Sequence, residues 1–159
     1  CRRSAPRWGP LRLPSPGLRQ SFNPHLVFGA LSYESGKVTN RFSLKVEADS
    51  FLQFEWRDYS AGGYQVGPRF AIRKGRLEID AKHSLDLPLD QWVGFEVQAT
   101  LGPKGNARWT LRVERPGKQP KTFADLSYGT AAFKKLTWVG FTSAATKKTV
   151  FYLDDFDLK

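Results

Sequence analysis

The amino-acid sequence predicts an all-β protein, an antiparallel β-sandwich, from three observations. From residue 22 onward, short stretches alternate between apolar and polar residues, as in strands with one buried face. Turn-forming glycine, proline, asparagine and aspartate residues interrupt these stretches. No segment shows the helical periodicity of an amphipathic helix. About ten strands at this regular spacing favour a sandwich or barrel over a parallel α/β sheet.

The strands are assigned from the runs in which apolar and polar side chains alternate. The clearest hairpin joins residues 92–101 to residues 107–114 through a Gly-Pro-Lys-Gly-Asn turn. A second hairpin is expected where 64–72 returns through 76–81 across a Lys-Gly turn. Further strands are predicted at 37–47, 51–57, 121–126, 136–143 and 149–158, with one helical turn at 131–135.

The first residues differ in composition from the rest of the chain. Residues 1–21 contain five arginines, no acidic residue and four prolines, and proline opposes both regular helices and central strands. The remaining length suits a single core. We therefore predict an Arg/Pro-rich arm or linker over 1–21 and a β-sandwich domain over 22–159.

The net charge of +10 is unevenly distributed. Half of the excess lies in residues 1–21, and the remaining lysines and arginines are scattered among fifteen acidic residues. Phosphate binding requires a concentrated basic stripe, whereas scattered charge is typical of a solvated surface. The charge pattern therefore does not favour nucleic acid as a partner.

The single cysteine, Cys1, cannot form an internal disulfide, so the fold depends on packing. No run approaches the roughly 18 consecutive apolar residues that a membrane-spanning helix needs. One interpretation of Cys1 is the lipid-modified cysteine of a mature bacterial lipoprotein, and the alternative is an unmodified free thiol.

Five stretches of sequence carry a resemblance to a known family. They are FLQFEWRD at 51–58, VGPRFAI at 66–72, WVGFEVQATLG at 92–102, LTWVGFTS at 136–143 and VFYLDDFDL at 150–158. Together they resemble the concanavalin A-like lectin/glucanase superfamily, jelly-roll sandwiches that include laminin-G-type domains and many bacterial carbohydrate-associated modules. The resemblance implies a jelly-roll β-sandwich, a carbohydrate ligand, and an extracytoplasmic location, secreted, periplasmic or surface-attached.

The catalytic pattern of the glucanase branch is missing. Those enzymes place alternating carboxylates on one strand, and retaining glycosidases need two carboxyl groups close together. Here Glu55 is followed by Trp56 and Arg57, with no second acid on the same face of that strand. The chain also lacks the sequence signatures of serine hydrolases, phosphate-binding loops and zinc proteases. We therefore expect a protein that is not an enzyme.

The polar side chains of the predicted strands could line the open face of one sheet. If those strands are neighbours, this face would be a polar surface with a net positive charge. Sugars bind to planar hydrogen-bonding groups and stack on aromatic rings, and arginines favour acidic glycans. The alternative is a solvated face with cross-strand ion pairs. The candidate ligand-binding residues are Arg41, Glu55, Arg57, Tyr59, Tyr64, Gln98, Arg108, Arg112 and Trp138, and Trp56 and Trp92 are further candidate platforms.

Asp154 and Asp155 lie in the last predicted strand, where the resemblance implies a structural Ca²⁺ in many jelly-roll modules. Calcium needs six to eight oxygen ligands, and adjacent side chains on a strand point to opposite faces. At most one or two of these carboxylates could serve, and a turn or capping role is the alternative. No other cofactor is expected.

The preferred function is a non-catalytic, lectin-like carbohydrate-binding module of a larger secreted or surface protein, with an acidic glycan as ligand. One alternative is a structural or protein-interaction domain whose N-terminal arm docks on a protein partner. The other is a glycan hydrolase or lyase with a non-standard site.

Overall fold

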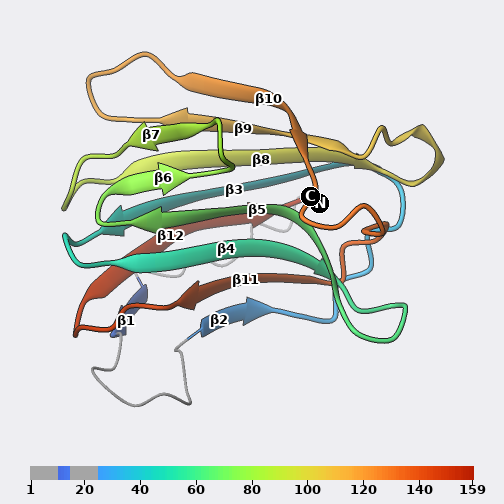
Figure 1. Cartoon of the computed structure of the whole chain (residues 1–159), viewed down its shortest axis with the longest axis horizontal. Helices are drawn as coiled ribbons and strands as arrows, with labels where there is room; N and C mark the ends of the chain where they lie inside the picture. Colours follow the sequence, from blue (N-terminus) through green and yellow to red (C-terminus); the bar gives the residue numbers. More distant parts are fainter. Residues whose placement is uncertain (1–10, 15–24) are drawn as a thin grey trace, which may run out of the picture.

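The computed structural model describes residues 11–14 and 25–159, which form two stacked antiparallel sheets (Figure 1). Sheet A has the order β1 (Leu11–Pro14), β12 (Val150–Leu158), β3 (Gly36–Val46), β8 (Val93–Leu101), β9 (Arg108–Glu114) and β10 (Lys121–Ser127). Sheet B has the order β2 (His25–Phe28), β11 (Trp138–Ser143), β4 (Phe51–Asp58), β5 (Gln65–Arg73), β6 (Arg76–Glu78) and β7 (Ser84–Asp86). The predicted all-β, antiparallel sandwich is confirmed.

The two predicted hairpins are confirmed, as β8–β9 and β5–β6. The helical turn predicted at 131–135 is wrong. Only residues 131–132 form a turn, in which the N–H of Phe133 donates to the carbonyl of Thr130 at 3.2 Å, and residues 133–135 have no regular structure. The strand predicted at 76–81 ends at Glu78, because the Asp80 carboxylate accepts hydrogen bonds from the N–H groups of Lys82 and His83 and turns the chain into β7.

β1 lies within the predicted N-terminal arm. Leu11–Pro14 pairs antiparallel with β12 at the edge of sheet A, so this part of the arm belongs to the sandwich. An edge position fits a strand that ends in proline, because proline has no backbone N–H to donate to a neighbouring strand. Cys1 and the other residues before Leu11 lie outside the described residues.

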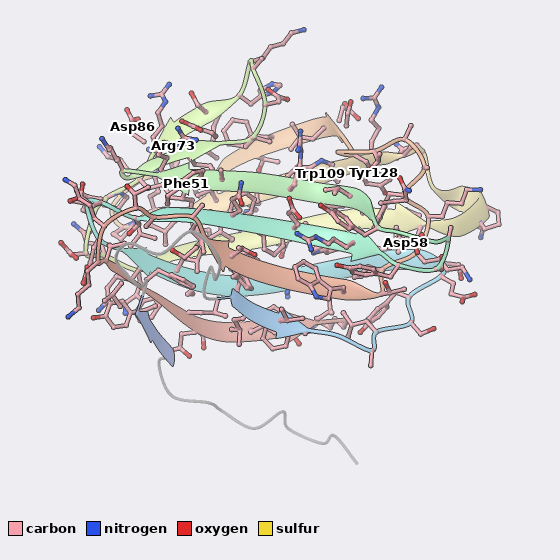
Figure 2. All side chains as sticks on the ribbon, turned by 60° about the horizontal axis from the view of Figure 1, so that its bottom comes forward. Phe51, Asp58, Arg73, Asp86, Trp109 and Tyr128 are labelled. Atoms are coloured by element: carbon pink, nitrogen blue, oxygen red, sulfur yellow. The ribbon has the colours of Figure 1, made fainter. Side chains whose placement is uncertain are left out.

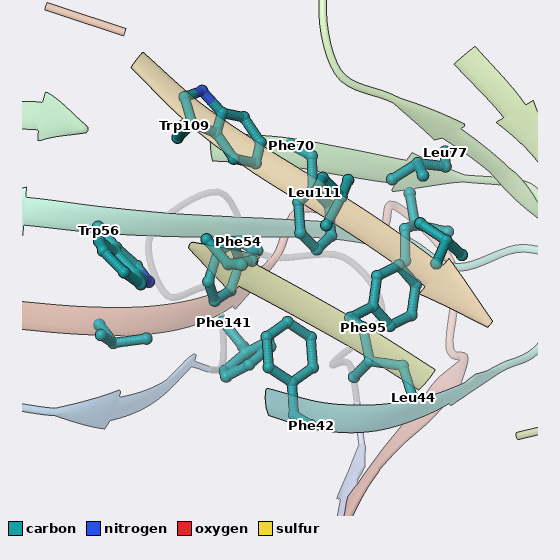
Figure 3. Close-up of a cluster of buried hydrophobic side chains, with 14 of the residues drawn as sticks. Phe42, Leu44, Phe54, Trp56, Phe70, Leu77, Phe95, Trp109, Leu111 and Phe141 are labelled. Atoms are coloured by element: carbon teal, nitrogen blue, oxygen red, sulfur yellow. The ribbon is translucent and has the colours of Figure 1, made fainter. Parts of the chain in front are cut away.

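The core lies between the sheets and is rich in phenylalanine. Phe42 of sheet A lies 5.0 Å, ring centre to ring centre, from both Phe54 and Phe141 of sheet B, and 5.5 Å from Phe95 of its own sheet (Figure 3). Burying such rings is the main stabilising contribution, since each removes a large apolar area from water.

No helix in the described part of the chain is long and apolar enough to span a membrane.

Three strand pairs contain irregularities in their pairing. The register shifts between Asp154 and Asp157 where β12 pairs with β3, between Phe123 and Leu126 where β10 pairs with β9, and between Glu55 and Arg57 where β4 pairs with β5. An extra residue on one strand of a pair is a β-bulge, which locally bends the strand.

Candidate functional site

The nine candidate ligand-binding residues do not share one face. Five of them, Glu55, Arg57, Tyr59, Tyr64 and Trp138, lie on or beside sheet B, and the other four, Arg41, Gln98, Arg108 and Arg112, lie on sheet A. The expected single open face is therefore wrong. Both sheets alternate buried and solvent-facing residues, so their polar faces point away from the shared core in opposite directions.

On sheet A the charged side chains pair with one another. Arg41 forms an ion pair with Glu96, and the Gln98 amide donates to the same carboxylate at 2.8 Å. Arg112 is paired with Glu114. The fourth candidate on this sheet, Arg108, donates to the hydroxyl of Ser127. This face corresponds to the alternative of a solvated surface with ion pairs.

On sheet B, Arg57 is the centre of an aromatic cluster. Its guanidinium carbon lies 4.2 Å from the centre of the Trp138 ring and 4.4 Å from the centre of the Tyr64 ring. Nε and Nη2 each lie 2.7 Å from Glu55 Oε2, and Nη1 donates to the Tyr59 hydroxyl at 3.1 Å. These contacts fix the guanidinium in one position. A guanidinium has five N–H donors, so two remain for a ligand.

Strand pairing explains why these residues meet. Alternation along β4 puts Glu55 and Arg57 on the outer face, and Trp138 of β11 stands directly opposite Arg57. Tyr59 and Tyr64 follow β4 in the loop to β5, and these residues are 46% and 51% exposed. Two aromatic rings and a charged group are therefore accessible to a ligand at one end of the β4–β5 pair.

The Arg57 guanidinium stays charged. Burial lowers its pKa, but the hydrogen bonds to Tyr59 and Glu55 outweigh burial and raise the pKa above its ordinary value. A permanently charged, fixed guanidinium is well suited to binding a carboxylate through two parallel hydrogen bonds.

A hollow of about 260 Å³ lies on the outer face of sheet A, and one of about 320 Å³ lies beside the Arg57 cluster on sheet B. The second hollow has the small Ala71 among its lining residues, together with Gln53, Glu55, Arg69, Glu78 and Asp80. A second acid on this face does not lie along the strand of Glu55. It is Glu78, a residue absent from the predicted site, which β6 brings to the same face by pairing opposite Ala71. The Lys-Gly hairpin in the sequence is the signal for this pairing, because its register places Glu78 there.

The other aromatic candidates differ in their surroundings. Trp56 is fully buried in the core, so it is not a platform for a ligand. Trp92 lies on the sheet A side, where its ring is 6.4 Å from the ring of Tyr152 and 5.3 Å from the ammonium of Lys45. Neither residue joins the Arg57 cluster.

Asp154 and Asp155 lie at the bulge in β12. The backbone φ of Asp155 is 53°, and the Asp154 carboxylate accepts a hydrogen bond from the N–H of Asp155 at 2.8 Å. This is the turn-type role given above as the alternative to metal binding. Among the described residues, no group of three or more His, Cys, Asp or Glu side chains could hold a metal ion. Structural calcium stays a prediction.

No protein-family model and no curated protein matches the chain. Several solved structures share its architecture. An endo-β-1,4-glucuronan lyase from the fungus Trichoderma reesei aligns with a TM-score of 0.58 and 9% identity, over 94% of this chain and 80% of that one. The PL-14 alginate lyase from Aplysia kurodai aligns with a TM-score of 0.53 and 10% identity, over 81% and 71%. A double mutant of congerin II aligns with a TM-score of 0.50 and 6% identity, over 86% and 100%.

The chain has the concanavalin A-like jelly-roll fold. At these identities the likeness concerns the fold alone. The concanavalin A-like resemblance inferred from the five strand sequences is confirmed at that level. A shared fold does not by itself assign a function, which depends on the residues that each sheet face presents.

Proposed function

We propose that this concanavalin A-like domain is a non-catalytic carbohydrate-binding module that binds an acidic glycan at the Arg57 cluster. The observation that carries the proposal is the fixed guanidinium of Arg57, held by Glu55 and Tyr59 and stacked on Tyr64 and Trp138. Its two remaining donors suit a sugar carboxylate, and the exposed tyrosine rings suit the apolar C–H surface of a sugar.

The fixed position of Arg57 favours binding further. An arginine that is already ordered in the free protein loses little side-chain entropy when a ligand arrives. Two of the structures that share the fold are named as lyases of polysaccharides, glucuronan and alginate. Those names are consistent with a glycan ligand for this domain.

Replacing Arg57 tests the proposal. Arg57→Gln should weaken binding of a glucuronan oligosaccharide by about tenfold or more, because a charge-assisted hydrogen bond contributes roughly 1.5–3 kcal/mol. Arg57→Lys should recover little, since an ammonium keeps the charge but loses the planar pair of donors. Isothermal titration calorimetry measures both, with circular dichroism to establish that each variant is folded.

Arg112→Gln is the matched control, since Arg112 is an ion-paired arginine on the outer face of sheet A. Its affinity should equal that of the unmodified protein. A glucuronan oligosaccharide that binds Arg57→Gln and the unmodified protein equally well would refute the proposal, as would an equal loss in Arg112→Gln.

Glycan cleavage is a second candidate function, favoured by the carboxylates of Glu55, Glu78 and Asp80 around one hollow. Two carboxyl groups can act as acid and base on a glycosidic bond when their spacing is right. Chromatography of the same titration mixtures decides between the two functions. Products that disappear in Glu78→Gln would favour cleavage, and unchanged glycan favours a binding module.

A further inference from the structure

The face that holds Arg57 has a second arginine stacked on an aromatic ring, at the other end of the same pair of strands. The guanidinium carbon of Arg73 lies 4.2 Å from the centre of the Phe51 ring. Phe51 and Arg73 stand opposite each other where β4 begins and β5 ends. In Figure 2 they lie near one end of the strands, and Asp58, which follows Arg57, lies at the opposite end.

Strand geometry sets the spacing of the two arginines. Arg73 pairs with Phe51, which is six residues from Arg57 along β4. At about 3.3 Å per residue, the two positions are separated by roughly 20 Å. A monosaccharide or disaccharide does not reach from one to the other, whereas a longer oligosaccharide does.

Arg73 is available to a ligand, unlike Arg76, which lies opposite it on the same face. It is exposed, and no carboxylate of the described residues forms an ion pair with it. Arg76, directly opposite on β6, is held by Asp86 at 2.9 Å and by the Ser84 hydroxyl at 2.6 Å. Arg73 therefore resembles Arg57 in its stacking, and it has more of its donors free.

Hydroxyl-binding groups occupy the space between the two stacked arginines. Gln53 and Glu78 flank the small Ala71 in the hollow, and the exposed Arg69 lies along the same strand. Carboxylates and amides accept or donate the hydrogen bonds that sugar hydroxyls need. An extended chain along β4 and β5 would thus find polar partners over its whole length.

We propose that this face binds an acidic oligosaccharide longer than a disaccharide, which lies along β4 and β5 with one carboxylate at Arg57 and another at Arg73. The proposal rests on the proposed function and extends it from a single point to two. Two attachments on one ligand act cooperatively, because the second forms at a high effective concentration once the first has formed.

The test is a length series of oligoglucuronates, from the disaccharide to the octasaccharide, titrated into the full chain. The unmodified protein should bind the octasaccharide at least about tenfold more tightly than the disaccharide. Arg73→Gln should abolish this gain and leave disaccharide affinity within about twofold, while Arg57→Gln should weaken both ligands. Arg76→Gln is the matched control and should behave as the unmodified protein.

The outcomes separate the two proposals. A length-dependent gain that survives Arg73→Gln, or that Arg76→Gln removes equally well, overturns the two-point proposal but leaves binding at Arg57 intact. Equal affinity of the unmodified protein for all oligosaccharide lengths would also overturn the two-point proposal and leave binding at Arg57 intact. The absence of binding at every length overturns both.

Discussion

Gly140 determines where the Trp138 ring can lie. It is a buried residue of β11, and a Cβ atom added there would overlap three atoms of the Trp138 ring. The indole therefore lies flat against the sheet over Gly140, and from this position it contacts the guanidinium of Arg57. A residue without a side chain is required here for close approach, not for an unusual backbone conformation.

Gly140→Ala should displace the Trp138 indole and weaken glycan binding about three- to tenfold, since a stacked cation–π contact contributes roughly 0.5–2 kcal/mol. It should also reduce the free energy of unfolding by about 1–3 kcal/mol through overpacking. Calorimetric titration and urea unfolding measure the two effects. Gly94→Ala on sheet A is the control, because its Cβ would meet Glu114 at an ordinary 3.5 Å. Similar affinities for the two variants would contradict this role of Gly140.

Asp58 anchors the loop that carries Tyr59 and Tyr64. It is buried, and its carboxylate accepts hydrogen bonds from the N–H and the hydroxyl of Ser60, at 2.8 and 2.6 Å, and from the N–H of Lys135 at 3.0 Å. Burial raises the pKa of Asp58, but these hydrogen bonds together hold it below its ordinary value. The charged form is therefore favoured in the folded protein.

The low pKa of Asp58 predicts a pH-dependent contribution to stability. The contribution is fully present above the unfolded-state pKa, about 3.9, and is lost as the pH falls through the lower folded-state pKa. Asp58→Asn should therefore be less stable than the unmodified protein at neutral pH, and the difference should shrink as the pH falls below about 4. Urea unfolding across this pH range measures it, and a difference that stays constant would show that Asp58 is not responsible.

At the scale of elements, β3 packs sheet A against sheet B through the side chain of Phe42. This ring contacts Phe54, Phe70 and Phe141 across the core and Phe95 beside it. Interlocked rings of this kind leave a void when one is removed, because the neighbours relax only partly.

Phe42→Ala should lower the free energy of unfolding by about 3–5 kcal/mol, through lost burial and the cavity left behind. Phe42→Leu should lower it less, because leucine fills part of that volume. Val27→Ala, at a residue that is 37% exposed, is the control and should change stability little. Chemical denaturation compares the three, and equal losses in Phe42→Ala and Val27→Ala would disprove the packing argument.

Alternation predicted the long strands but not the short ones. In β8 every second residue from Val93 to Leu101 is buried, so the sequence carries a clear signal. β7 has three residues and β2 has four, which is too few for a period of two to stand out. The helical turn at 131–135 was predicted where the structure has only a turn, because so short a segment leaves its conformation to its tertiary neighbours.

At the scale of the whole molecule, sequence alone could not assign each strand to a sheet. Alternation indicates which side chains face water, but it does not say which of two water-facing surfaces they share. Arg41 and Arg57 occupy equivalent polar positions in their strands, yet they lie on opposite sides of the sandwich. The five members of the Arg57 cluster were all among the predicted candidates. Arg69, Glu78 and Arg73, which lie elsewhere on the same face, were not among them, because their placement depends on how β4, β5 and β6 pair.

The bulges in β12, β10 and the β4–β5 pair help each strand to pair with its neighbour in the correct register. A strand that slides by two residues along its neighbour keeps its apolar side facing inward, so burial alone barely opposes such an error. An extra residue at one point breaks that equivalence, because a shifted strand would carry its irregularity into a regular stretch and lose hydrogen bonds there. The extra residue between Asp154 and Asp157 thus fixes the register in which β12 pairs with β3.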